Sequence, residues 1–139
     1  MCDILLIEDD TVQANLLVRE LSRAAEEISL PFSVFCAADL KGADEFLSRH
    51  KVDAILLDLT LTSEDRPPRT FQWCQERARQ GRAVVIVTGA ANEVETRNLA
   101  WEHGAQGVIF KQDRESIPKN MLQAAMNAKA RAKVWRYVG

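Results

Sequence analysis

Five short apolar runs recur along the chain, separated by longer stretches of mixed polarity. Four of the five runs are nearly continuous rather than alternating, which is typical of strands covered on both faces in a parallel sheet. The runs lie at residues 4–7, 32–35, 54–57, 83–87 and 108–110. This pattern predicts five strands.

The stretches between and after these runs have apolar residues at helical spacing. Their apolar positions include Leu17, Leu21, Ala24, Ala25 and Ile28, then Leu40, Ala43, Phe46 and Leu47, then Phe71, Cys74 and Ala78, then Val94 and Trp101, and finally Leu122, Ala125 and Met126. Strand and helix therefore alternate five times.

Local signals mark several helix boundaries. The spacing of a capping box is found at Asp10 with Gln13 and at Asn92 with Glu95. Ser116 followed by Pro118 has the arrangement of an N-cap and an early helix residue. Gly81 and Gly104 lie where helix C-termini require a left-handed residue.

The predicted fold is α/β, a doubly wound parallel sheet of (βα)₅ type with helices on both faces, because parallel crossovers are right-handed. Neither an internal repeat nor a Gly/Ser linker divides the chain, so we expect a single domain over residues 1–139. Residues 129–139 contain four cations and no acid, and form either the basic end of the last helix or a linker.

Composition narrows the functional classes. The chain has 139 residues, with 18 Lys and Arg against 20 Asp and Glu and a formal net charge of -2. This balance argues against a generic polyanion binder, so we expect no direct contact with nucleic acid. The longest apolar runs are far shorter than the about 20 residues of a membrane-spanning helix.

The N-terminal residues and the cysteines indicate a cytoplasmic protein. Residues 1–10 lack the basic start of a secretory signal and place acids directly after the apolar stretch. Cys2, Cys36 and Cys74 form an odd set without a CxxC pair. We expect them to be incidental thiols rather than disulfide or zinc ligands.

Polar residues follow the predicted strands at their C-terminal ends, the edge where open α/β sheets bind ligands. Three carboxylates, Glu8, Asp9 and Asp58, would repel one another there unless a cation intervened, and hard oxygen ligands in this number suit Mg²⁺. Lys111 can pair with phosphoryl oxygens, and the hydroxyl of Thr88 can donate a hydrogen bond to one of them. The set is chemically complete for forming an aspartyl phosphate.

With these motifs the chain resembles the receiver domain of two-component response regulators. The motifs are ILLIEDD at 4–10, AILLDLT at 54–60, VVIVTGA at 84–90 and GVIFK at 107–111, in the order of that family. The resemblance implies the flavodoxin-like receiver fold with strand order 2-1-3-4-5. It also implies phosphoryl transfer with Mg²⁺ from a phosphohistidine on a sensor histidine kinase or a histidine phosphotransfer protein.

The resemblance also assigns roles to individual residues. Glu8 and Asp9 match the acidic pair of the family, and Asp58 matches its phosphoacceptor. Thr60 matches the position whose backbone carbonyl reaches the metal. The conserved hydroxyl and lysine correspond to Thr88 and Lys111. Asp10 is expected to be a helix N-cap rather than a metal ligand, because the spacing to Gln13 accounts for it.

The chain departs from the family pattern in three places. Val108 stands where receivers usually have an aromatic residue, and Gln112 follows the lysine in place of the usual proline. The segment after Asp58 lacks the common Pro and Gly positions and carries two consecutive prolines, after which Thr70 is expected to cap the next helix. Trp101, His103 and Phe110 lie near the face that receivers commonly use for partners. Packing in or beside the core is the favoured expectation for them, with His103 at a helix C-terminus.

The leading function is a response regulator that signals through protein contacts and catalyses only its own phosphorylation and dephosphorylation. Its close alternative is the receiver fragment of a longer regulator with a DNA-binding or enzymatic output, and a homodimer is left open. DLTLT at 58–62 also resembles the DxDxT of haloacid dehalogenase-type phosphatases, but Thr60 replaces the second aspartate. A flavodoxin-like cofactor binder is disfavoured, because the acidic turn EDDT would repel a phosphate.

Overall fold

The computed structural model describes residues 2–61, 64–89, 91–111 and 117–138, without the side chains of 117, 129 and 131–138. The elements follow in the order β1 (Cys2–Ile7), α1 (Thr11–Glu27), β2 (Phe32–Ala37), α2 (Leu40–Leu47), β3 (Ala54–Asp58), α3 (Arg69–Arg79), β4 (Val84–Thr88), α4 (Glu93–Glu102), β5 (Gly107–Phe110) and α5 (Ile117–Val138). Each predicted strand is present, with ends that differ by one or two residues.

All five strands are parallel and form one sheet in the order β2-β1-β3-β4-β5. The predicted fold class and strand order are thus confirmed. The register brings Asp58 of β3 opposite Val87 of β4, and Thr88 opposite Phe110 of β5. The C-terminal ends of the central strands therefore lie side by side at one edge of the sheet.

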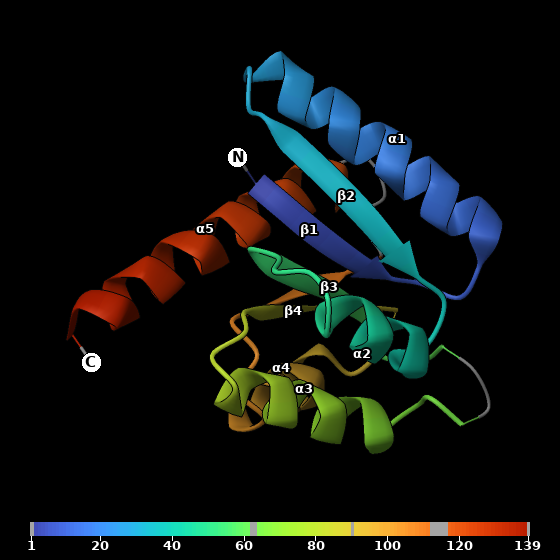
Figure 1. The fold of residues 1–139 in the computed structure, drawn as a ribbon. Coiled ribbons are helices and arrows are strands. Elements are labelled where there is room, and N and C mark those ends of the chain that lie inside the picture. Colours follow the sequence, from blue (N-terminus) through green and yellow to red (C-terminus); the bar gives the residue numbers. More distant parts are fainter. Residues whose placement is uncertain (1, 62–63, 90, 112–116, 139) are drawn as a thin grey trace.

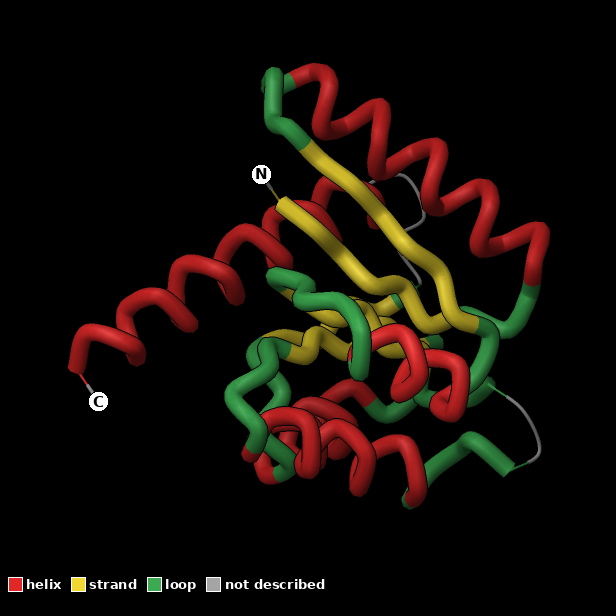
Figure 2. The backbone as a smooth tube through the Cα atoms, in the orientation of Figure 1, coloured by secondary structure: helices red, strands yellow, loops and turns green. Residues whose placement is uncertain are grey.

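Helices cover both faces of this sheet. α1 and α5 lie on one face, and α2, α3 and α4 lie on the other (Figures 1 and 2). Each face has its own apolar core: Leu21 of α1 and Met121 of α5 belong to the first, and Cys74 of α3 and Ala100 of α4 belong to the second. Every residue of β3 and β4 is buried, which explains why these runs are continuously apolar.

The predicted caps begin and end helices as expected. The Asp10 carboxylate accepts from the backbone N–H of Val12 and Gln13 at 3.0 and 3.1 Å, and Asn92 accepts from the N–H of Glu95 at 3.0 Å. Gly81 and Gly104 have φ of +84° and +81°, respectively. The expected cap at Ser116 lies outside the described residues.

The expected cap at Thr70 is wrong. α3 begins one residue earlier, at Arg69, with Pro68 in the cap position and no side-chain capping bond. The Thr70 side chain is fully buried, and its hydroxyl instead donates to the backbone carbonyl of Leu59 at 2.8 Å. The Thr70 hydroxyl, which the sequence pattern predicts to cap α3, therefore makes a tertiary hydrogen bond to Leu59 instead.

The three expected packing residues differ in exposure. His103 is the C-cap of α4, with Nδ1 2.6 Å from the carbonyl oxygen of Leu99. Phe110 is half-buried under the guanidinium of Arg97, at 5.0 Å from the ring centre. Trp101 is 74% exposed, so the expectation that it packs is wrong. α4 turns this side chain away from the sheet that its own Ala100 contacts.

The last helix carries the basic segment. α5 runs to Val138, so the backbone of residues 129–138 continues this helix.

Among the described residues, we find no helix with the length and apolar character needed to span a membrane.

The fold predicts unequal reactivity of the three thiols. Cys36 is exposed at the sheet edge, whereas Cys2 and Cys74 are buried, and burial raises the pKa of Cys74 to about 12. Partial burial also raises the pKa of Cys36, but of the three cysteines it alone is exposed, so we expect one thiol per native chain to react ahead of the others with a chromogenic disulfide reagent, and three to react after unfolding. Cys36→Ser should abolish the fast phase. A fast phase of two or three thiols in the native protein would contradict the buried positions.

Candidate functional site

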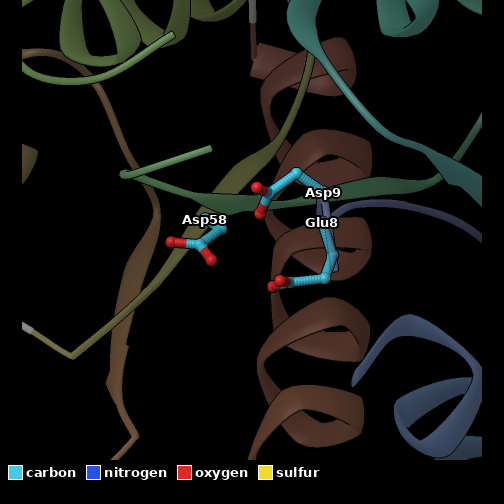
Figure 3. A group of neighbouring side chains, drawn as sticks. All are labelled: Glu8, Asp9 and Asp58. Carbon is cyan, nitrogen blue, oxygen red and sulfur yellow. The ribbon is translucent and has the colours of Figure 1, made fainter. Parts of the chain in front are cut away.

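Three carboxylates meet at the C-terminal edge of the sheet. Glu8 and Asp9 directly follow β1, and Asp58 is the last residue of β3, the strand beside it. One oxygen from each carboxylate lies within 4.8 Å of the others. Figure 3 shows the three side chains converging on a shared space from these two strand ends. The structure thus brings together the three acids that the sequence predicts to share a site.

The cluster is buried on one side and open on the other. Glu8 and Asp58 are 6% and 8% exposed, whereas Asp9 is exposed to solvent. Lys111, directly after β5, places its Nζ 2.9 Å from Oδ2 of Asp58 and 3.6 Å from Oε2 of Glu8. A lysine from the far end of the chain therefore offsets the two buried acids.

The electrostatics of the cluster reflect this crowding. Burial raises the pKa of Glu8 to about 7, and a hydrogen bond with Asp58 and its charge act in the same direction. Lys111 loses hydration, which by itself lowers its pKa, but the hydrogen bonds and charges of Asp58 and Glu8 together outweigh this effect and raise its pKa. Glu8 therefore changes its charge near neutral pH, whereas Lys111 stays charged there.

Backbone contacts hold the remaining predicted site residues next to Asp58. The N–H of Thr60 donates to Oδ1 of Asp58 at 3.1 Å. Thr88 is buried and follows Val87, the register partner of Asp58. The backbone N–H of Lys111 donates to the carbonyl of Thr88 at 2.9 Å. All six predicted site residues therefore lie around the ends of β1, β3, β4 and β5.

Asp10 lies beside the cluster but faces the helix. Its exposed carboxylate caps α1, as expected, and its backbone N–H donates to Oε1 of Glu8 at 3.3 Å. The backbone of Asp10 thus fixes the turn that contains Glu8 and Asp9. The side chain of Asp10 is hydrogen-bonded to the N-terminus of α1 and does not face the cluster.

The departures from the family pattern have different outcomes. Val108 is half-buried in β5 and packs against the core under α2, α3 and α4. Gln112 lies outside the described residues.

Asp65 is a buried acid near the site that the sequence gives no local reason to select. It is 7% exposed, and its carboxylate accepts from the backbone N–H of Leu40 at 3.0 Å. This partner is 25 residues earlier in the chain. The one available signal was weak: Asp65 is an acid in the loop between a predicted strand and a predicted helix, which does not by itself predict a buried side chain.

The donor set fits a hard divalent cation. Carboxylate oxygens are the ligands that Mg²⁺ prefers, and it usually takes one or two of them while keeping several waters. The crowding of Glu8, Asp9 and Asp58 within 4.8 Å would be relieved by a cation, and the exposed side at Asp9 leaves room for water or phosphate oxygens.

Solved structures with this fold include receivers from distant organisms. A CheY-like response regulator receiver domain protein from Methanospirillum hungatei is 18% identical, with a TM-score of 0.73 over 96% of this chain and 97% of that chain. A response regulator receiver domain protein from Clostridium thermocellum is 19% identical, with a TM-score of 0.75 over 97% of this chain and 99% of that chain. These likenesses establish the fold.

A longer protein also contains this fold. NtrX from Brucella abortus is 22% identical, with a TM-score of 0.76 over 98% of this chain but 29% of that chain. A comparison with curated protein sequences gives no significant match.

The family-level comparison covers the sheet and the acidic edge together. The sequence profile of the response regulator receiver domain matches residues 4–124 of the 139, from within β1 into α5. The chain belongs to the response regulator receiver domain family.

Proposed function

We propose that this domain is a phosphoacceptor response regulator in which Asp58 receives a phosphoryl group from a phosphohistidine. The donor is a sensor histidine kinase or a histidine phosphotransfer protein. The observation that carries the proposal is the placement of Asp58, which is buried beside Glu8 and Asp9 with Nζ of Lys111 at 2.9 Å. A carboxylate held only for stability would not need two further acids beside it.

In the transfer step, a carboxylate oxygen of Asp58 attacks phosphorus. The new O–P bond forms as the N–P bond breaks, and the electron pair of that bond stays on the histidine nitrogen. Glu8, Asp9, Asp58 and the backbone carbonyl of Thr60 would hold Mg²⁺, which would supply positive charge to neutralise the transferring oxygens. Lys111 and the hydroxyl of Thr88 stabilise the phosphoryl oxygens by charge and by hydrogen bonding.

The domain acts on itself alone and passes its state to a protein partner. We propose one receiver domain over residues 1–139, located in the cytoplasm, without direct contact to nucleic acid; a homodimer is left open. The alternative, a receiver fragment of a longer regulator, is supported by the fold shared with NtrX, of which this chain spans 29%. The phosphatase alternative loses support, because Thr60 replaces its second aspartate and the motif closes the third strand.

The first test is phosphorylation by a small phosphodonor such as acetyl phosphate. With Mg²⁺, the wild-type mass should increase by one phosphoryl group, and Asp58→Asn should show no increase because the nucleophilic oxygen is gone. Asp10→Asn is the matched control, since it makes the same chemical change near the site and asparagine also caps helices well. Label on Asp58→Asn, or none on wild type with this donor and Mg²⁺, would refute the assignment.

The second test is stabilisation by Mg²⁺. A ligand that binds only the folded state adds about 1.4 kcal/mol to the free energy of unfolding when its free concentration is ten times its Kd. We expect Mg²⁺ to raise the unfolding midpoint of wild type, and to have much less effect on Asp9→Asn because one carboxylate ligand is lost.

The controls separate binding from general charge effects. Asp10→Asn removes the same charge one residue away and should keep the full response to Mg²⁺, while Na⁺ at equal ionic strength should give none. An equal response of Asp9→Asn and Asp10→Asn would show that Asp9 is not a ligand.

A further inference from the structure

The segment between β3 and α3 is tied to the rest of the fold on both sides of Thr60. On the first side, the hydroxyl of Thr70 donates to the carbonyl of Leu59 at 2.8 Å. Thr70 is 0% exposed and Leu59 is 3% exposed, so water does not compete for this bond. The hydroxyl therefore holds the carbonyl just before Thr60 in place.

On the second side, the N–H of Leu61 donates to the backbone carbonyl of Asp65 at 2.8 Å. Asp65 is itself anchored, because its carboxylate accepts from the N–H of Leu40 at 3.0 Å and lies 3.3 Å from Nε of Arg69. Leu40 is the first residue of α2, where the helix dipole favours a negative charge. The Asp65 side chain thus links the segment between β3 and α3 to the N-terminus of α2.

These ties restrict the two peptide groups that flank the α-carbon of Thr60. In a planar trans peptide, the C=O and the N–H point in opposite directions, so fixing one fixes the other. In the first group, Leu59 C=O is held by Thr70 and Thr60 N–H is held by Oδ1 of Asp58. In the second group, the bond of Leu61 N–H fixes the direction of the Thr60 carbonyl.

We propose that Thr70 and Asp65 are positioning residues that orient the backbone carbonyl of Thr60 for Mg²⁺. The inference rests on the proposed function, which uses this carbonyl as a metal ligand. A ligand that is already oriented loses less conformational freedom when the metal binds, and groups that orient metal ligands commonly change metal affinity by tenfold or more when removed.

The test is direct titration of the metal-free full chain with Mg²⁺ by calorimetry. Thr70→Val keeps the shape of the side chain and removes its donor, and should raise the Kd for Mg²⁺ about tenfold. Thr70→Ser restores the hydroxyl and should return the Kd to within about twofold of wild type. Asp65→Ala releases the other tie and should also raise the Kd, which gives an independent variant if Thr70→Val does not fold.

Phosphorylation rates and a stability control distinguish positioning from loss of stability. With a small phosphodonor, the rate of Thr70→Val should approach wild type at saturating Mg²⁺, because Asp58 is intact and the defect is in metal affinity. Leu21→Ala in the α1 core lowers stability far from the segment and should leave the Kd unchanged.

Two failures are distinguishable. In the first, wild type binds Mg²⁺, and the Kd values of Thr70→Val and Asp65→Ala lie within about twofold of the wild-type Kd. The positioning proposal is then wrong, and the proposed function stands. If wild type itself binds no Mg²⁺, the proposed function fails and this inference fails with it.

Discussion

The constraint on which the structure depends is that a parallel sheet must be covered on both faces. Because β3 and β4 are buried from end to end, their polar residues can lie only where the strands stop. Parallel direction then brings these ends to one edge of the sheet. Asp58 and Thr88 become neighbours for this reason, although 30 positions separate them in the sequence numbering. The acidic site is a consequence of sheet packing.

The buried acids at this edge of the sheet are electrostatically unfavourable. Burying Glu8 and Asp58 together is unfavourable, and Lys111 offsets the cost only in part, as the raised pKa of Glu8, about 7, shows. A divalent cation beside these carboxylates would favour the ionised form of Glu8. The burial and crowding of the acids that raise the pKa of Glu8 are therefore the same features that make the cluster suitable for a cation.

Much of this architecture was predictable from local sequence, and the exceptions share a cause. The strands, the caps at Asp10 and Asn92, and the grouping of the site residues follow from periodicity, side-chain chemistry and motif order. The burial of Asp65 and the bond of Thr70 to Leu59 do not, because their partners are set by how α2 and α3 pack. A threonine near the start of a helix has two possible partners, the helix backbone or a tertiary group, and the packing of the helix decides between them.

Lys111 connects the site to the end of β4 through two different groups. Its Nζ pairs with Asp58 at 2.9 Å, while its backbone N–H donates to the carbonyl of Thr88 at 2.9 Å. In the proposed phosphorylated state, the phosphoryl oxygens would carry the negative charge, and the ammonium of Lys111 would pair with them. The peptide of Lys111 is fixed to Thr88 by this backbone hydrogen bond, and Thr88 is the last residue of β4, the strand before α4. The side chain of Asp58 is thereby linked through Lys111 to the backbone at the end of β4, the neighbouring strand.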